Sequence, residues 1–235
     1  MKKIVLSLVA FGTLFGASNE EILKLYSGAP SNVKISVENR ISLKEAPGYD
    51  LVILKVEHEG GVQNEFVFTK DNLAFFDIID IKSQESLKVK YENEINNKKI
   101  ATQYKNEKAE NIVKIGNDPK KETLVVFTDP ECPYCRQELS QIDKRLEKFN
   151  IEMIFVPVHG ISSYQKSALI LKHTRKAKTD NDKIAIVKKY YDEKITLTEK
   201  VEDKELENIQ KIAKKFQNAG VTGVPRIVEK SKIIK

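Results

Sequence analysis

The sequence predicts a mixed α/β (α+β) protein with two domains, and three stretches of it support that prediction. Residues 19–84 contain β-branched and aromatic runs separated by turn residues, which is typical of an antiparallel sheet. From residue 115 onward a strand, a helix and a second strand follow one another, an order that produces a parallel strand pair. Residues 160–219 show helical patterns with no strand between them. With 235 residues, the chain is long enough for each domain to bury a core.

The first domain is predicted to begin with a short helix and to continue as strands. The segment EEILKLYSG starts with two acidic residues and ends at Gly28, as expected for a helix followed by a glycine. Two breaks in the apolar runs that follow, at residues 60–61 and 70–72, indicate hairpin turns. Side chains alternate along a strand, so Val52, Leu54 and Val56 are expected on one face.

The charge pattern argues against nucleic-acid binding. The formal net charge is +6, but only five of the forty cationic side chains are arginines. The lysines are interspersed with nearly as many acidic residues. Arginine supplies the bidentate fork that suits phosphates and base edges, so this distribution indicates a solvated surface.

Residues 1–18 have the pattern of a secretory signal peptide. Lys2 and Lys3 precede an apolar run from Ile4 to Phe15, and small residues follow up to Ser18. A membrane-spanning helix needs about 20 apolar residues, so this shorter run fits an export signal better. We expect cleavage after Ser18 and a mature protein in a compartment where disulfides persist. A buried N-terminal helix or an uncleaved anchor is the alternative.

Residues 85–114 are predicted to form a linker helix between the domains. They are mostly lysine, glutamate, asparagine and glutamine, with few apolar residues and with neither proline nor glycine. Without these helix breakers, the segment is more consistent with a solvated helix than with a flexible linker.

The second domain, residues 115–235, contains the residues with the clearest chemistry. The segment ETLVVFTD is a continuous apolar strand, consistent with burial on both faces. Cys132 follows it, and the next residues, up to 150, are predicted to form a helix with Pro133 in its first turn. Apolar residues recur along this helix at helical spacing and are expected to face the core: Leu139, Ile142, Leu146 and Phe149.

The chain has two cysteines, Cys132 and Cys135, and three interpretations of the pair compete. A zinc site would need two more ligands, and the three histidines are scattered along the chain. A structural disulfide across so short a loop would restrain the unfolded chain little, so it would add little stability. Thiol–disulfide exchange is the third interpretation.

The position of the pair favours thiol–disulfide exchange. Backbone N–H groups and the dipole at a helix N-terminus favour negative charge, so a thiolate at Cys132 is expected to be stabilised. Thiolates in such motifs can have pKa values lowered to about 3.5–7.5, which makes them reactive at neutral pH. Cys135, one turn into the helix, is placed to attack the mixed disulfide and release the substrate. No metal and no organic cofactor are expected, because the Cys132–Cys135 disulfide would itself be the redox group.

The segments VVFTDPECPYC and GVTGVPRIV, with helices between them, resemble the thioredoxin superfamily, specifically the periplasmic protein-disulfide isomerases DsbC and DsbG. The resemblance implies a cystatin-like dimerisation domain at residues 19–84, a linker helix at 85–114 and a thioredoxin-like catalytic domain at 115–235. The catalytic domain would contain a helical insertion at about 160–219. The resemblance further implies a periplasmic homodimer that acts on unfolded or misoxidised secreted proteins. A membrane thiol reductant like DsbD would donate the electrons.

By the same resemblance, Cys132 matches the nucleophilic cysteine, Cys135 the resolving one and Val224–Pro225 the cis-proline loop. A cis X–Pro bond exposes the preceding backbone groups to an extended substrate peptide. An ordinary trans proline at a strand start is the alternative for this position. Pro133 and Tyr134, between the cysteines, are also expected to lie at the substrate-binding surface.

This sequence departs from the isomerase pattern in two places. The isomerases usually have threonine before the cis-proline, whereas Val224 is more like the DsbA oxidases. The final segment, RIVEKSKIIK, has room for a hairpin but not for the terminal helix of the family. In addition, the position six residues before Cys132 is Val126, so no buried acid is evident there to assist proton transfer.

The expected function is therefore thiol–disulfide interchange of the isomerase or reductase type on secreted proteins. A DsbA-like disulfide oxidase is one alternative, which Val224 favours. A holdase chaperone that binds unfolded chains without redox chemistry is another.

Overall fold

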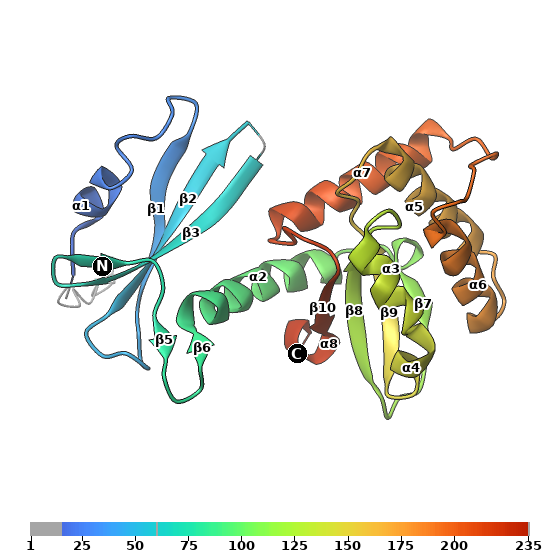
Figure 1. Ribbon diagram of the computed structural model, residues 1–235, viewed down its shortest axis with the longest axis horizontal. Coiled ribbons are helices and arrows are strands. Elements are labelled where there is room, and N and C mark those ends of the chain that lie inside the picture. Colours follow the sequence, from blue (N-terminus) through green and yellow to red (C-terminus); the bar gives the residue numbers. More distant parts are fainter. Residues whose placement is uncertain (1–15, 60, 235) are drawn as a thin grey trace, which may run out of the picture. The chain divides into compact units, whose positions relative to one another are not determined.

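The computed structural model describes residues 16–59 and 61–234, and the chain divides into two compact units. The first unit comprises residues 1–92 and the second residues 93–235, and each has its own sheet (Figure 1). Of the predicted signal peptide, residues 1–15 lie outside the described residues. Within the described ranges, no helix is both long enough and apolar enough to cross a membrane.

The first unit contains a short helix and a four-stranded antiparallel sheet in the order β1-β2-β3-β4. These elements are α1 (Asn19–Lys24), β1 (Lys34–Ser42), β2 (Asp50–His58), β3 (Gly61–Lys70) and β4 (Leu73–Phe75). A separate two-stranded hairpin follows, formed by β5 (Ile79–Asp80) and β6 (Glu85–Ser86). The predicted helix and both predicted hairpin turns are therefore confirmed, but the helix ends at Lys24, with Leu25 as its C-cap, and not at Gly28.

Helix α1 begins where its first residues satisfy each other's backbone groups. The Ser18 hydroxyl accepts from the Glu21 amide at 3.3 Å, and the Glu21 carboxylate accepts from the Ser18 amide at 2.8 Å. This reciprocal capping box fixes the start of the helix. The helix then buries Ile22 against a small core that includes Val52 and Leu54, two of the three residues expected on one strand face, whereas Val56 is half-buried.

The linker helix is shorter than the sequence predicts. Helix α2 covers Leu87–Lys105, and a turn of 3-10 helix, η1 (Ala109–Asn111), comes before strand β7 (Val113–Ile115). Residues 85–114 are therefore not one helix, because Val113 and Ile115 alternate with an exposed lysine and pair with the sheet of the second unit. The helix is also not fully solvated, since Ile100 and Tyr104 are buried in the core of that unit.

The second unit is built on a four-stranded sheet in the order β10-β8-β9-β7. Strands β8 (Glu122–Thr128) and β9 (Phe149–Phe155) are parallel, which confirms the predicted strand–helix–strand unit. Strand β7 runs antiparallel to β9, and β10 (Arg226–Glu229) runs antiparallel to β8.

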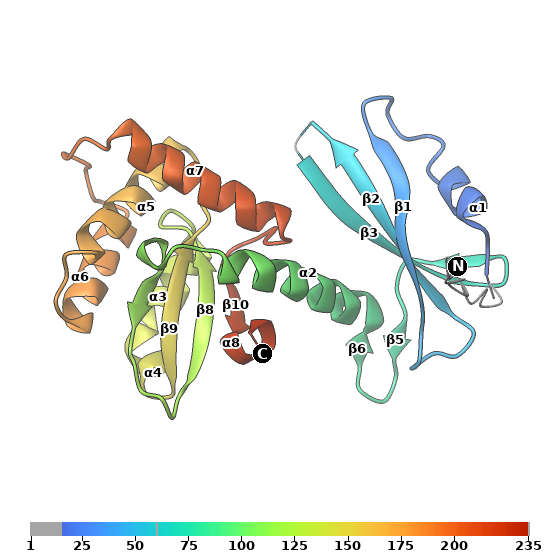
Figure 2. The same cartoon turned by 180° about the vertical axis from the view of Figure 1, so that it is seen from behind.

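Helices cover both faces of this sheet. Figures 1 and 2, which view it from opposite sides, show α3 (Pro133–Ser140) and α4 (Ile142–Leu146) on one face. Helix α7 (Asp203–Asn218) packs on the other face, where the rings of Phe127 and Phe216 lie 5.0 Å apart between centroids.

The helix predicted from Pro133 to residue 150 is interrupted at Gln141. The backbone there has φ −97° and ψ 8°, outside the α-helical region, so α3 ends and α4 begins. The break keeps both Leu139 and Ile142 buried against the sheet. Phe149, expected at the end of this helix, is instead the first residue of β9.

The predicted helical insertion is confirmed as three helices, α5 (Ile161–Thr174), α6 (Asp180–Tyr191) and α7. After β10, however, the chain does not form the predicted hairpin. It makes one short helix, α8 (Lys230–Ile233), which packs against β8 and β10. Helix α8 buries Ile233, whose exposed fraction is 4%. Burial of this side chain favours the bend of the chain after β10.

Candidate active site

Cys132 occupies the N-cap position of α3. Its amide donates to the Asp129 carbonyl at 3.2 Å, and its carbonyl accepts from the Arg136 amide at 3.0 Å, the first bond of the helix. Pro133 follows at the first helical position, where the missing N–H group costs nothing. The Cys132 side chain makes no capping hydrogen bond, so its sulfur stays available near the positive end of the helix.

Cys135 lies one turn further along and is more deeply buried, with 1% of its surface exposed against 4% for Cys132. Burial raises the pKa of the Cys135 thiol to about 12, although hydrogen bonds from the Thr128 hydroxyl and the Asp129 amide oppose that rise. Both cysteines are free thiols in this structure. The pair is therefore asymmetric, with a protonated thiol held behind the residue at the helix start.

The loop before β10 reaches the cysteines. The Val224–Pro225 peptide bond is cis, as the resemblance implies. The Cys132 thiol lies 3.5 Å from the Val224 carbonyl oxygen and donates to it. The structure thus brings together Cys132, Cys135 and Val224, which are 92 residues apart at the extremes. Tyr134, by contrast, is 69% exposed and, like Pro133, lies on the outer side of the helix start.

The sequence does not predict that the carboxylate of Asp129, three residues before Cys132, is buried. Its Oδ2 accepts from the amides of Val158 and His159 at 2.8 and 3.2 Å and contacts the His159 ring Nδ1 at 2.7 Å. Its Oδ1 accepts from the Glu131 amide at 2.8 Å and from the Ser163 hydroxyl. This one side chain therefore ties the loop before Cys132 to the loop before α5.

The same contacts set the protonation of Asp129. Burial alone would raise its pKa, but the hydrogen bonds from Ser163, His159 and the backbone amides outweigh burial and hold the pKa below its ordinary value. The carboxylate is consequently ionised at neutral pH. Its oxygens face α5 and the preceding loop. Asp129 is therefore a different group from a proton-transferring acid at position 126, where this chain has valine.

An ion pair between buried Lys166 and half-buried Glu131 flanks the nucleophile. The ammonium group of Lys166, on α5, lies 3.1 Å from the carboxylate of Glu131, the residue directly before Cys132. The Lys166 side chain is 5% exposed. The Ser162 hydroxyl donates to the same carboxylate at 2.7 Å and is the main reason why the pKa of Glu131 lies below its usual range. Lys166 thereby offsets the negative charge next to Cys132.

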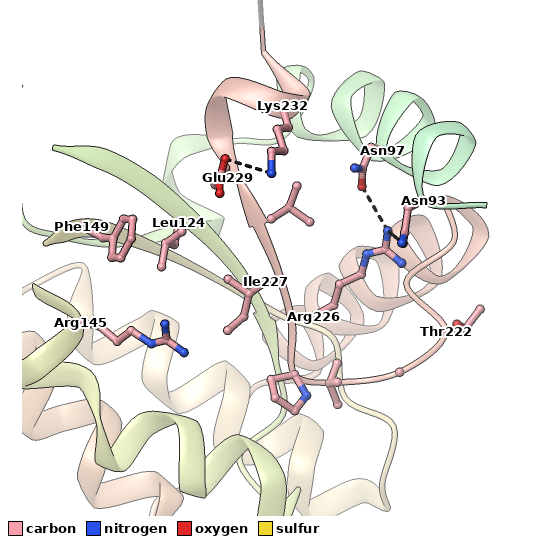
Figure 3. A pocket seen from close by; sticks show the side chains of 14 residues that line it. Asn93, Asn97, Leu124, Arg145, Phe149, Thr222, Arg226, Ile227, Glu229 and Lys232 are labelled. Carbon is pink, nitrogen blue, oxygen red and sulfur yellow. Dashed lines mark hydrogen bonds and ion pairs between the residues drawn. The ribbon is translucent and has the colours of Figure 1, made fainter. Parts of the chain in front are cut away.

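A groove of about 970 Å³ runs from the cis-proline loop along β10 (Figure 3). Val224 and Pro225 are among the residues that line it, and Ile227 contributes an apolar side chain to its wall. On one side, the Arg226 guanidinium donates to Asn97 of α2 at 3.1 Å, which keeps the arginine at the groove wall. Val224, which lines the groove, has its carbonyl oxygen 3.5 Å from the Cys132 sulfur, so an extended peptide bound in the groove would lie near that sulfur.

In the described part of the chain, no further metal-ligating side chains are grouped with Cys132 and Cys135. Among residues 16–59 and 61–234, no group of three or more histidine, cysteine, aspartate or glutamate side chains is arranged to hold a metal ion. A zinc site of the usual kind takes four protein ligands, or three with a water.

Comparison with known proteins identifies one domain family. The sequence model of the thioredoxin-like domain matches residues 108–231, which is more than half of the chain. DsbG of Helicobacter pylori is 20% identical to this chain, with a TM-score of 0.53, and covers 90% of this chain and 100% of its own. A linker-deletion variant of Proteus mirabilis ScsC is 22% identical, with a TM-score of 0.49, over 60% of this chain and 75% of its own. No curated protein sequence matches.

Proposed function

Because the chain belongs to the thioredoxin-like domain family, we propose that it is a periplasmic thiol–disulfide interchange enzyme of the isomerase type. One observation carries the proposal most directly: the Cys132 sulfur lies at the start of α3, 3.5 Å from the carbonyl before the cis-proline, with Cys135 behind it. The substrates would be partly unfolded secreted proteins that contain wrong disulfides. The fold-level similarity to DsbG over both units supports this proposal.

The proposed reaction uses the asymmetry of the two thiols. The Cys132 thiolate attacks a substrate disulfide, so one substrate sulfur joins Cys132 and the other leaves with the electron pair and takes a proton. Another substrate thiol can then attack the adduct, which rearranges the substrate without net oxidation. Alternatively Cys135 attacks Cys132, the substrate leaves reduced, and a Cys132–Cys135 disulfide forms. A membrane thiol reductant would return the enzyme to its dithiol form.

The activity is tested with insulin reduction and with the recovery of scrambled ribonuclease. We expect the Cys132→Ser variant to lose both activities by at least about a hundredfold, since no other thiolate can start the exchange. Ser140→Ala, at an exposed position on the same helix, is the matched control and should match wild type. Equal activity of Cys132→Ser and wild type would refute the proposal, and aggregation suppression that survives loss of both cysteines would point to a holdase.

A disulfide oxidase is the second candidate, because the residue before the cis-proline is Val224 rather than threonine. The two functions require opposite resting states of the same cysteines. Acid quenching of cells followed by thiol labelling reports that state directly. Mostly reduced cysteines would support the isomerase, and mostly oxidised cysteines would support the oxidase.

The first unit supports a proposed homodimer. Large apolar side chains remain exposed over a short stretch of it: Leu73, Phe76, Ile79 and Ile81, with exposed fractions of 61, 60, 55 and 90%. These side chains lie close together in the sequence. This closeness, together with the resemblance, favours a second copy of this chain as the partner that covers them. We expect sedimentation to give a dimer for wild type and a monomer for a Phe76→Asp, Ile81→Asp double variant. Ile161→Asp, at a 58% exposed position of the second unit, is the control and should stay dimeric.

A further inference from the structure

Behind Cys135 lies a pair of hydroxyl groups that the mechanism above does not use. Thr128 is the last residue of β8 and Tyr191 the last residue of α6, and their side-chain oxygens are 2.6 Å apart. Both residues are buried, with exposed fractions of 2 and 3%. The Thr128 hydroxyl also hydrogen-bonds the Cys135 sulfur. Three elements thus contribute to one continuous chain of polar atoms that ends at the resolving cysteine.

The single hydrogen of each hydroxyl fixes the direction of this chain. When Cys135 ionises for its attack, its sulfur has no hydrogen to donate, so the Thr128 hydroxyl is then the donor to that sulfur. Thr128 has then no hydrogen left for Tyr191, and the 2.6 Å bond must run from the Tyr191 hydroxyl to Thr128 Oγ1. Burial raises the pKa of Tyr191 well above its usual value, so Tyr191 keeps the proton that it donates.

The neighbouring carboxylates are engaged elsewhere. Asp129 accepts hydrogen bonds from the α5 side of the site. A cavity of about 20 Å³ borders Cys135 and Thr128, and Glu138 also lines it, but the Glu138 carboxylate is held by Arg145 at 2.8 and 3.1 Å. The groups that do donate to the Cys135 sulfur are the Thr128 hydroxyl and the Asp129 amide.

Arg136, on α3, links the end of α6, where Tyr191 lies, to the segment before Cys132. The Arg136 guanidinium, on α3, lies 2.5 Å from the carboxylate of Glu193, two residues after the end of α6. The same guanidinium donates to the Glu131 carbonyl at 3.0 Å. Arg136 therefore connects the segment after α6 to the residue before Cys132.

We propose that Thr128 is a catalytic residue of the resolving step and that Tyr191 is the residue that positions it. The inference rests on the proposed thiol–disulfide exchange. In that step the S–H bond of Cys135 breaks, a bond forms between the two cysteine sulfurs, and the bond from Cys132 to the substrate sulfur breaks. The proton of Cys135 passes to solvent, and the substrate sulfur leaves with the electron pair and takes a proton from solvent. The Thr128 hydrogen bond stabilises the negative charge that develops on Cys135 before its attack.

The two chemical steps can be separated with an aromatic disulfide, dithiobis(nitrobenzoic acid), which releases a coloured thiol at each step. Attack by Cys132 gives the first phase and attack by Cys135 gives the second. We expect Thr128→Val to slow the second phase by about ten- to a hundredfold, the effect of losing a hydrogen bond to a charged group. Tyr191→Phe should slow the second phase by several-fold. Thr128→Ser, which keeps the hydroxyl, should give a second phase close to that of wild type. The first phase should change less than about twofold in all of them.

Tyr190→Phe is the matched control, because Tyr190 is the buried neighbour of Tyr191 and stacks on His173 instead. It should leave both phases unchanged. In Thr128→Val the pH profile of the second phase should also move to higher pH, which a loss of packing alone would not produce. A normal second phase in Thr128→Val or Tyr191→Phe overturns the inference. Absence of the first phase in wild type would instead refute the proposed function.

Discussion

Replacing Asp129 with alanine is expected to lower the free energy of unfolding of the second unit by about 3–5 kcal/mol. The carboxylate is fully buried and accepts from three backbone amides, from the Ser163 hydroxyl and from the His159 ring. The variant would remove the acceptor of all five donors, and the Ser163 hydroxyl, which belongs to a fully buried residue, would be left without a partner at a substantial cost. Urea unfolding followed by circular dichroism measures the loss.

The pH dependence gives this prediction a second check. The pKa of Asp129 is lower in the folded protein than its ordinary value of 3.8, because hydrogen bonds outweigh burial. A depressed folded pKa contributes stability that is present above the unfolded pKa and is lost as pH falls through the folded pKa. The difference between wild type and Asp129→Ala should therefore be constant near neutral pH and shrink below about pH 3.8.

Asp143→Ala is the matched control, since Asp143 has a 72% exposed side chain and a single surface ion pair with Lys188 at 3.0 Å. Exposed ion pairs contribute roughly 0–1 kcal/mol, so this variant should unfold almost like wild type. Equal stability of Asp129→Ala and Asp143→Ala would mean that the Asp129 hydrogen bonds do not hold the two loops together.

Local pattern was sufficient to predict most of the second unit. Continuous apolar residues identified β8, and the position of Cys132 after that strand located the start of α3. Long amphipathic patterns identified the three inserted helices. Each of these features is encoded within a window of about ten to twenty residues, where hydrophobic periodicity is informative.

Several features that depend on distant contacts were not predicted from local pattern. Strand β7 is three residues long, and only its pairing with β9 distinguishes it from the end of a polar helix. Ile100 and Tyr104 are one turn apart in a polar helix, and two such residues are too few to signal a buried side. The contact between Thr128 and Tyr191 joins residues 63 positions apart, beyond the reach of any periodic pattern.

The buried acid illustrates the same limit. Position 126, six residues before Cys132, is where a buried acid would be expected from sequence spacing, and it holds a buried valine. Asp129 was visible only as a polar residue at the end of a strand. Its role follows from the loop at Val158 and His159 and from Ser163, which approach it from about 30 residues away. Burial of an acid therefore depends here on tertiary packing and not on local composition.

Replacing Cys135 with serine is expected to trap substrates on Cys132 as covalent adducts. Cys132 would still attack a substrate disulfide, but the buried group placed to displace the substrate would be missing. Incubation with unfolded, disulfide-containing insulin should convert most of the variant to an adduct that mass spectrometry detects and dithiothreitol reverses. Wild type should show at least about tenfold less adduct, because Cys135 resolves it.

The complementary variant, Cys132→Ser, should form no adduct, because the remaining thiol is buried. Burial is the main cause that raises the pKa of Cys135, and it persists when Cys132 is replaced, so little of the thiol would be ionised near pH 8. Its alkylation by iodoacetamide should stay slow at neutral pH and rise only as pH approaches that pKa. Rapid alkylation of Cys135 near pH 8, or adducts on Cys132→Ser, would show that the second thiol is open to solvent. The division between an attacking and a resolving cysteine would then be wrong for this chain.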